Sequence, residues 1–156
     1  MDDFDRFYNS SLRFLSYRPR SEKEVRDKLV SKKASLEIAD KVISKLKKYN
    51  FVNDAEFAKK WIEDRSKFKP RSFRLIKLEL KRKGIDDETI DNLHLTISSD
   101  LEQAKKLVEK RIIRFRNKFG MTREEIYQKL GRFLASKGFS WDTIKKSIDE
   151  TLDKVV

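Results

Sequence analysis

Apolar residues recur every three or four positions along most of the chain, which is the period of an amphipathic α-helix. Ile38, Val42 and Leu46 form one such series, and Ile76 with Leu80 belongs to another. No stretch alternates in period two for long enough to indicate a β-strand. The pattern of apolar and polar positions therefore predicts an all-α protein.

Residues that favour turns or helix ends separate the predicted helices. They are Pro19, the segment 50–54, Pro70, Gly84, Ser98 with Ser99, Gly120 and Gly138. Ser21 is followed three residues later by Glu24, which is the spacing of a capping box. Because proline lacks an amide hydrogen and has a fixed φ, we expect each proline to end one helix and to suit the first turn of the next.

The two prolines lie in almost the same four residues, RPRS at 18–21 and KPRS at 69–72. A shift of 51 residues also aligns the apolar positions that follow, for example Leu29 with Leu80. Self-similarity at a fixed spacing is the sequence signature of a repeat architecture.

A weaker third copy aligns residues 134–144 with 80–90 at a shift of 54. We therefore predict three tandem three-helix repeats, at residues 1–52, 53–98 and 99–156, with the last one divergent. Each repeat is too small to bury a core alone, so stacked repeats should share their apolar surface. The expected result is an elongated, curved molecule.

The composition limits the classes of protein to which the chain can belong. There are no cysteines among the 156 residues, so neither a disulfide framework nor thiolate chemistry is available. No apolar run approaches the ~18 residues that a membrane-spanning helix needs, and the acidic beginning MDDFDRF is unlike a signal peptide. We expect a soluble, cytoplasmic protein that is a monomer.

Charge is the strongest functional signal. Lys and Arg number 38 against 26 Asp and Glu, a formal net charge of +12. Residues 65–83 hold nine basic residues and one acid, Glu79, and residues 105–118 hold seven basic residues and one acid, Glu109. Such surfaces attract phosphate backbones or acidic protein surfaces, although a solvated helix face kept soluble by lysines has the same composition.

These segments supply the candidate contact residues. The principal set is a basic stripe, Arg71, Arg74, Lys77, Lys81, Arg82 and Lys83, among which Leu75 and Leu78 add apolar character. A secondary cluster comprises Lys105, Lys106, Arg111, Arg114, Arg116 and Lys118. Arg18 and Arg20 are the candidates in the first repeat.

Other kinds of site find little support. A helix-turn-helix protein would place its third helix on DNA, but the third helix of the second repeat begins with the acidic string DDETIDN. The single histidine, His94, aligns with Ile43 and Ile148 of the other repeats, which indicates helix packing. We predict no catalytic residue, no metal site and no cofactor, and hence no enzyme activity.

The two tryptophans are the remaining residues with a candidate role, because an indole ring can stack on a base. Trp61 lies four residues after Phe57, a helical spacing that favours core packing. Trp141 follows Ser140, a good helix cap, and is expected to be partly exposed.

Three strings carry a resemblance to a known family. They are LRFLSYRPRSEKEVRDKL at 12–29, YNFVNDAEFA at 49–58 and KLELKRKGID at 77–86. In order and spacing they resemble the conserved strings of RecX, the bacterial regulator of the RecA recombinase. The resemblance is strong from about residue 10 to residue 95 and looser beyond.

The resemblance implies three tandem three-helix repeats and binding along the groove of a RecA–single-stranded DNA filament. Such binding would inhibit ATP hydrolysis, strand exchange and filament extension in recombination, DNA repair and the SOS response. Two alternatives remain open: a general nucleic-acid-binding protein that does not depend on RecA, and a scaffold for a different acidic partner.

Overall fold

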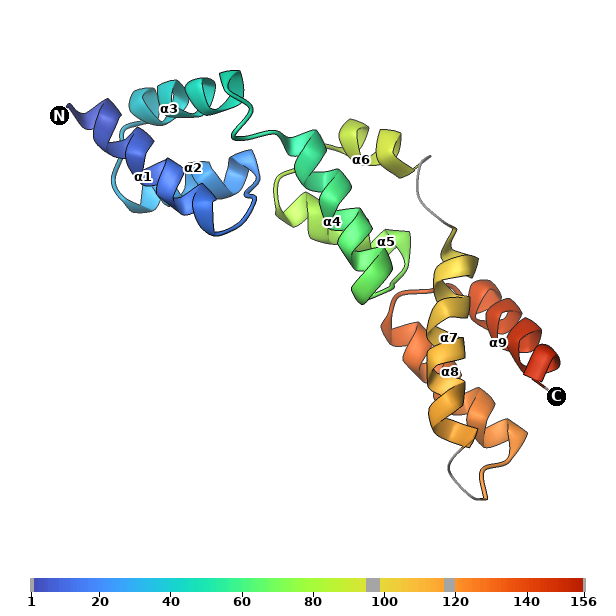
Figure 1. The fold of residues 1–156 in the computed structure, drawn as a ribbon. Coiled ribbons are helices and arrows are strands. Elements are labelled where there is room, and N and C mark those ends of the chain that lie inside the picture. Colours follow the sequence, from blue (N-terminus) through green and yellow to red (C-terminus); the bar gives the residue numbers. More distant parts are fainter. Residues whose placement is uncertain (1, 95–98, 117–119, 156) are drawn as a thin grey trace. The chain divides into compact units, whose positions relative to one another are not determined.

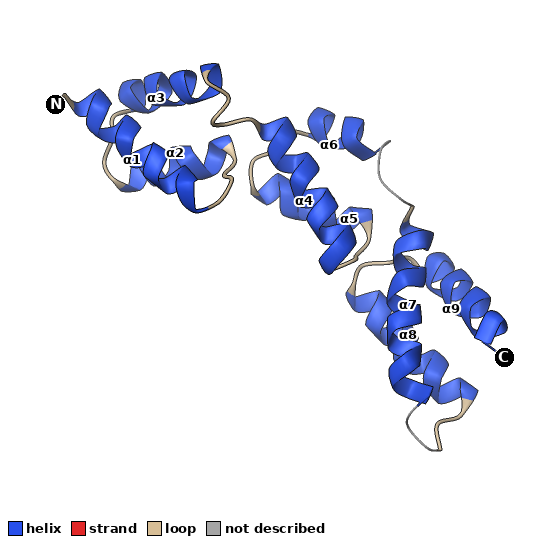
Figure 2. Cartoon of the chain, in the orientation of Figure 1, coloured by secondary structure: helices blue, strands red, loops and turns tan. Residues whose placement is uncertain are grey.

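The computed structural model describes residues 2–94, 99–116 and 120–155, and these contain nine helices and no strand (Figures 1 and 2). The helices are α1 (Asp3–Tyr17), α2 (Glu22–Ser31), α3 (Leu36–Lys48), α4 (Asp54–Phe68), α5 (Phe73–Arg82), α6 (Asp87–His94), α7 (Asp100–Arg116), α8 (Arg123–Ser136) and α9 (Trp141–Val155). The prediction of an all-α chain built from three groups of three helices is confirmed.

Each of the nine described helices begins where a short polar side chain accepts a hydrogen bond from a backbone amide of the first turn. The accepting residues are Asp2, Ser21, Ser35, Asn53, Ser72, Asp86, Ser99, Thr122 and Ser140. The expected capping box at Ser21 and Glu24 is present, and a second one joins Thr122 to Glu125. These caps explain why the breaks read from the sequence lie close to the observed helix ends.

The prolines do not occupy the first turn of the following helix, contrary to expectation. Helix α2 begins at Glu22 after the cap Ser21, so Pro19 lies two residues before that cap. Pro70 lies two residues before Ser72, whose hydroxyl accepts from the Leu75 amide. Each proline therefore ends the preceding helix and holds the connection extended, and the serine begins the next helix.

The chain divides into two compact units. Unit 1 comprises residues 1–61 and 79–93. Its main core lies among α1, α2 and α3 and is built from Phe7, Val25, Leu29, Ala39, Val42, Ile43, Leu46 and Val52. The series of apolar residues predicted for α3 is thus the buried face of that helix.

Unit 2 comprises residues 62–78 and 94–156. Its core lies among α7, α8 and α9, and its buried residues are Ala104, Leu107, Val108, Ile112, Leu130, Leu134, Phe139, Ile144, Ile148 and Leu152. The second repeat is shared: the first half of α4 and the end of α5 belong to unit 1, and the remainder of both helices belongs to unit 2.

Unit 1 contains the contact between the first and second repeats, which we call the first junction (residues 18–24, 54, 83 and 84). The amide of Glu22, at the start of α2, donates to the Asp54 carboxylate of the second repeat at 2.8 Å. Gly84, with φ of +82°, lies so close to Lys23 that a Cβ there would be 2.6 Å from the Lys23 Cβ. The first turn of α2 thus receives both a cap and a close backbone contact from the following repeat.

Unit 2 contains the second junction (residues 69–75, 100, 137 and 138), which has the same geometry. The amide of Phe73 donates to the Asp100 carboxylate at 2.9 Å. Gly138, with φ of +83°, lies so close to α5 that a Cβ there would be 2.5 Å from the Leu75 Cγ. The 51-residue similarity read from the sequence therefore corresponds to a repeated way of joining one three-helix group to the next.

Candidate partner-binding surface

Three basic side chains of the first junction converge on one carboxylate, that of Glu24. Arg18 contacts a Glu24 oxygen at 2.5 Å, and Arg20 lies 3.7 Å from the same oxygen. The Lys83 ammonium is 3.7 Å from the other oxygen. The side chain of Glu24 is only 15% exposed, whereas that of Arg18 is 43% exposed, so the carboxylate is partly shielded from solvent.

Aromatic rings flank the same cluster. The Arg20 guanidinium lies 3.9 Å from the centre of the Phe14 ring, and the Lys83 ammonium lies 5.6 Å from the Trp61 ring. Burial tends to raise the pKa of Glu24, but the hydrogen bond and charge of Arg18, followed by the charge of Lys83, bring that pKa below its ordinary value. Arg18, Arg20 and Lys83 therefore have a structural partner in the folded chain.

The second junction keeps the basic residues but has no acid at the position of Glu24. The 51-residue shift carries Arg18 to Lys69 and Arg20 to Arg71, and the 54-residue shift carries Lys83 to Lys137. The position of Glu24 is taken by Leu75, which packs against Gly138. Lys69 and Lys137 form no ion pair with any residue that the structure describes, so their charge is available to a partner.

Lys69 and Lys137 line a groove of about 270 Å³ in unit 2. We call it the basic groove; its other lining residues are Phe68, Pro70, Leu107, Lys110, Arg111, Arg114 and Phe133. A neighbouring hollow of about 460 Å³ shares Pro70 and Lys110 with it and is also lined by Ser66, Lys67, Lys106, Glu109 and Ile113. In the two hollows, basic residues at the end of α4 and just after it lie beside basic residues of α7.

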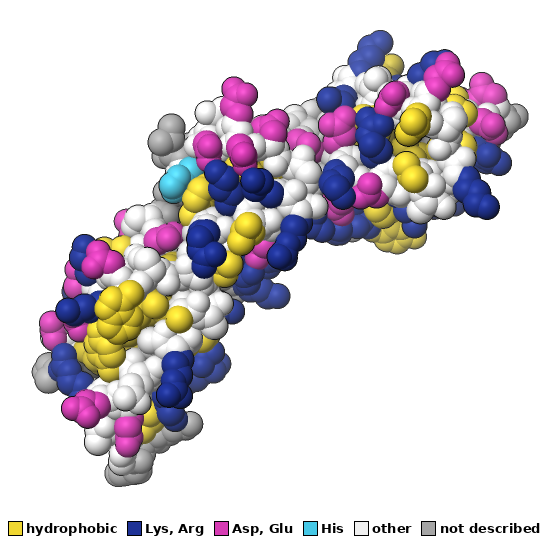
Figure 3. Space-filling model, turned by 180° about the vertical axis from the view of Figure 1, so that it is seen from behind, with side chains coloured by type: hydrophobic (Ala, Val, Ile, Leu, Met, Phe, Trp, Pro, Cys, Tyr) yellow, Lys and Arg dark blue, Asp and Glu magenta, His cyan; other side chains and the backbone are white. Residues whose placement is uncertain are grey.

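The basic groove combines cations with exposed aromatic surface. The Arg111 guanidinium lies 3.7 Å from the centre of the Phe133 ring, and the Lys137 ammonium lies 5.6 Å from it. Phe68 is 73% exposed at the rim of the groove. Lys and Arg side chains beside exposed hydrophobic ones are also visible on the face drawn in Figure 3. A surface of this kind is suited to a strand that offers both phosphates and flat bases.

The predicted basic stripe is less uniform than the sequence suggests. Arg74 is exposed, and its guanidinium reaches 3.5 Å from the carbonyl oxygen of Gly138. Lys81 is exposed and pairs with Asp87 at 3.4 Å, whereas Arg82 is exposed without a charged partner among the described residues. Of the candidate residues in and next to α5, Arg74, Lys81 and Arg82 therefore lie on the surface.

The other members of the stripe are less accessible. Arg71 and Lys77 are half-buried, and the Arg71 guanidinium donates to the carbonyl oxygen of Lys69 at 3.2 Å. Of the two leucines among the stripe, Leu75 is half-buried and packs on Gly138, whereas Leu78 is 43% exposed. The helical period alone could not separate them, because the neighbouring repeat covers one of the two.

The secondary cluster is also divided. Lys106, Arg111 and Arg114 line the two hollows, whereas Lys105 pairs with Glu150 of α9. The side chain of Arg116 and the whole of Lys118 lie outside the described residues. Lys69, Lys110 and Lys137 were not among the candidates; comparing the repeats at the position of Glu24 could have pointed to Lys69 and Lys137.

The aromatic residues singled out from the sequence have definite neighbours. Trp61 is half-buried, stacks on Phe57 with ring centres 5.9 Å apart and donates to the Glu79 carboxylate at 2.8 Å. Trp141 is 65% exposed, as expected. His94 stacks on Phe73 with ring centres 3.7 Å apart, so it takes part in helix packing although it is exposed at the end of α6.

Neither a metal site nor a membrane span is found among the residues that the structure describes. They hold no group of three or more His, Asp and Glu side chains placed to bind a metal ion. Every helix in that part of the chain is too short or too polar to cross a lipid bilayer. The basic groove and the exposed basic residues of α5 thus remain the candidate contact surfaces.

Comparison with known families identifies the chain. The first, second and third three-helix domains of RecX match residues 8–46, 53–92 and 98–148. The chain belongs to the RecX family. It is 37% identical over 146 residues to the regulatory protein RecX of Finegoldia magna, covering 92% of this chain and 70% of that relative.

Other RecX relatives are longer. The regulatory protein RecX of Bacillus pumilus is 36% identical over 148 residues, which cover 94% of this chain and 55% of that relative. The regulatory protein RecX of Bacillus subtilis is 34% identical over 151 residues, which cover 96% of this chain and 56% of that relative. The chain thus spans about half the length of these curated relatives.

Solved structures agree with this RecX assignment. A crystal structure of RecX from Lactobacillus salivarius superposes with a TM-score of 0.79 at 32% identity and covers 96% of this chain and 97% of that one. A second crystal structure of a regulatory protein RecX gives a TM-score of 0.78 at 26% identity, over 95% of this chain and 74% of that one. Fold and sequence therefore lead to the same family.

Proposed function

We propose that this protein regulates the RecA recombinase. It binds RecA–single-stranded DNA filaments along their groove and inhibits ATP hydrolysis, strand exchange and filament extension. It acts as a monomeric, cytoplasmic regulator with no enzyme activity of its own. Membership of a family whose curated members are regulatory proteins named RecX carries this proposal.

The basic groove of unit 2 provides the contact with single-stranded DNA. Lys69, Lys110 and Arg114 line it and have no acidic partner among the described residues, so they can neutralise phosphates with little competition. Phe68 offers an exposed ring on which a base can stack. Replacing such a stacking residue by alanine typically costs about 1–3 kcal/mol of binding free energy per base. The exposed residues Arg74, Lys81 and Arg82 supply further contacts with the filament.

A second candidate function is nucleic-acid binding that does not depend on RecA. The same groove favours it, because its cations and aromatic rings would recognise a free strand equally well. Binding to DNA with an affinity that RecA leaves unchanged would distinguish this function from filament regulation. Binding to neither DNA nor RecA filaments would instead favour a scaffold for another acidic partner.

The test uses a charge reversal in the basic groove, Lys110→Glu with Arg114→Glu. The matched control, Lys129→Glu with Lys145→Glu, changes the net charge equally at exposed positions that do not line the groove. We measure the DNA-dependent ATPase of RecA with increasing amounts of each protein. The groove variant should inhibit at least about fivefold less well than the control, since loss of two phosphate contacts costs on the order of 1–3 kcal/mol.

Two results would contradict parts of this proposal. Wild-type protein that leaves the RecA ATPase unchanged at saturating concentration would exclude the regulatory function. Equal inhibition by the groove variant and its control would exclude the groove as a required contact. Reversal of Arg74, Lys81 and Arg82 is measured in the same assay, and these exposed changes should alter the free energy of unfolding by only about 0.5 kcal/mol.

A further inference from the structure

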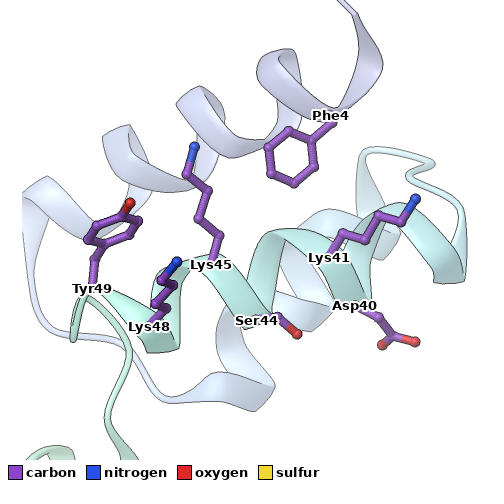
Figure 4. A pocket seen from close by; sticks show the side chains of 7 residues that line it. All are labelled: Phe4, Asp40, Lys41, Ser44, Lys45, Lys48 and Tyr49. Atoms are coloured by element: carbon purple, nitrogen blue, oxygen red, sulfur yellow. The ribbon is translucent and has the colours of Figure 1, made fainter.

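Another hollow, of about 500 Å³, lies between α1 and α3 in unit 1. Phe4 of α1 contributes one wall, and Asp40, Lys41, Ser44, Lys45, Lys48 and Tyr49 form the rest. Figure 4 shows the Lys45 side chain extending from α3 toward α1 beside the Phe4 ring. None of these residues belongs to the basic segments that the sequence emphasised.

The charge of this hollow is positive. Lys41, Lys45 and Lys48 stand at positions i, i+4 and i+7, so they share one face of α3 over about 10 Å. The lining acid, Asp40, points away from Phe4 in Figure 4 and is already paired with Arg26 at 2.6 Å. Lys45 and Lys48 form no ion pair with the residues described, so two cations face the hollow without a carboxylate.

Aromatic rings lie beside two of these lysines, Lys45 and Lys48. The Lys45 ammonium lies 4.3 Å from the centre of the Tyr8 ring and 5.5 Å from that of Phe4. The Lys48 ammonium lies 5.8 Å from the ring of Tyr49, which is 56% exposed. The hollow therefore presents positive charge beside aromatic surface.

The arrangement of the rings argues against a nucleic-acid strand. Phe4 and Tyr8 stack on each other, with ring centres 5.9 Å apart, and Lys45 covers a face of Tyr8. Base stacking requires open ring faces, which Tyr8 lacks because Lys45 covers it, and the exposed ring of Tyr49 lies beside Lys48. Lys41 already pairs with Glu37 at 3.2 Å, so a helix that carries acids one turn apart would meet Lys45 and Lys48, and its apolar residues match Phe4 and Tyr49.

We propose that the hollow between α1 and α3 docks an acidic, amphipathic helical segment of the protein partner, and not a nucleic acid. Under the proposed function, on which this inference rests, that partner is the RecA protomer. The molecule then divides its contacts: unit 1 binds protein through this hollow, and unit 2 binds the DNA strand through the basic groove.

The test compares Lys45→Glu with Lys48→Glu against a control, Lys59→Glu with Lys60→Glu, which reverses two exposed lysines of α4 in the same unit. Binding to three probes is measured: RecA without DNA, RecA filaments on a single-stranded oligonucleotide, and the oligonucleotide alone. The hollow variant should bind both forms of RecA at least about tenfold more weakly than the control, because like charges then face each other. Its affinity for the oligonucleotide should equal that of the control.

A second variant tests the apolar part of the hollow without a charge reversal. Tyr49→Ser removes exposed apolar surface and changes no charge. It should weaken RecA binding several-fold, with unchanged circular dichroism and unchanged oligonucleotide binding. Loss of oligonucleotide binding in either variant beyond that of the control would overturn the assignment to a protein partner.

Failure of the inference is separable from failure of the proposed function. RecA binding by the hollow variants at the level of the control would overturn the docking site and leave regulation intact. Absence of RecA binding by the wild-type protein would overturn both.

Discussion

The two junctions share a framework and differ in the chemistry that fills it. In each, a buried serine begins the middle helix of one repeat, an aspartate of the next repeat caps that helix, and a glycine with positive φ lies against its first turn. Cations stand at equivalent positions in both, but Glu24 in the first junction corresponds to Leu75 in the second. Glu24 therefore gives Arg18 and Lys83 a carboxylate that Lys69 and Lys137, at the equivalent positions, do not have there.

Under the proposed function, the difference explains how one repeat junction can contact a partner without a new motif. In the first junction Arg18, Arg20 and Lys83 surround a carboxylate, so much of their charge is compensated inside the protein. In the second, Lys69 and Lys137 line the basic groove and their charge is left for a partner. Basic residues at equivalent positions of the two junctions thus differ in whether a neighbouring acid compensates their charge.

The largest expected effect comes from the shared framework. Gly138→Ala would place a Cβ 2.5 Å from the Leu75 Cγ and 2.6 Å from the Ser72 hydroxyl, in a left-handed backbone conformation. The strain and overpacking should together lower the free energy of unfolding by about 2–5 kcal/mol. Denaturant unfolding measures this loss.

Two other glycines serve as controls for that substitution. Gly120→Ala meets the same backbone penalty, at φ of +89°, but has no atom within 4 Å of the new Cβ, so it should cost only about 1–2 kcal/mol. Gly84→Ala, against Lys23, should fall between the two. Equal losses at Gly138 and Gly120 would show that the second junction is not tightly packed in solution.

Converting the second junction into the first should have the next largest effect. Leu75→Glu places a carboxylate where Lys69, Arg71 and Lys137 correspond to the basic residues around Glu24. These cations should then pair internally, and the affinity for single-stranded DNA should fall at least about tenfold, or about 1.4 kcal/mol. Fluorescence anisotropy of a labelled oligonucleotide measures the change.

The uncharged variant Leu75→Gln separates charge from packing. Glutamine has nearly the size and polarity of glutamate, so this variant should retain most of the DNA affinity that Leu75→Glu loses. The dependence of log affinity on log salt should also become shallower in the glutamate variant, by roughly 0.7 for each phosphate that the protein no longer neutralises. Identical binding by both variants would refute the role of charge compensation.

The smallest expected effect is on the acid dependence of the first junction. The pKa of Glu24 is lower in the folded chain than its ordinary value, because Arg18 and then Lys83 outweigh the effect of burial. Its contribution to stability is therefore present above the ordinary Glu value of about 4.3 and is lost as pH falls through the lowered pKa. Glu24→Gln should reduce the free energy of unfolding by about 1 kcal/mol at pH 7 and by less below pH ~4.

The difference between wild type and variant is the quantity to measure, by urea unfolding from about pH 3 to pH 7. Asp54 lies in the same junction, and burial together with the charges of Glu22 and Asp86 raises its pKa, so its contribution to stability falls as pH rises. Subtracting the two curves cancels Asp54 and leaves Glu24. A difference that is independent of pH would rule out an ionised Glu24 as the centre of the cluster.

Much of the fold could be predicted from the sequence because its signals are local. The three-residue to four-residue apolar spacing, the serine caps and the glycines specify helices and their ends through contacts within one or two turns. The repeat followed from comparing the chain with itself, and three strings were enough to suggest the RecX family. The prolines were expected within the first turn of the following helix and lie before it, because the serine after each one is the cap.

The candidate site was only partly predictable, because it depends on residues far apart in the sequence. A strong basic excess is evident at 65–83 and at 105–118, but nothing in the pattern indicates that Lys69 and Lys110 line one groove. Arg20 and Arg71 also look equivalent in the sequence, although Glu24 contacts only the first of them. The charge pattern of a sequence shows how many basic residues a segment holds. It does not show which acidic residues lie against them in the folded chain.

The sequence by itself determined the helical class, the three repeats and the positive charge, since periodicity, caps and composition need no knowledge of the folded chain. Only the tertiary structure decided which cations are neutralised and which are exposed, because an ion pair requires two groups to approach within about 4 Å. The same holds for Leu75 and Leu78, which the helical period places alike and packing separates. Helices and their ends are specified by neighbouring residues in the sequence, whereas a binding surface forms only when distant segments pack together.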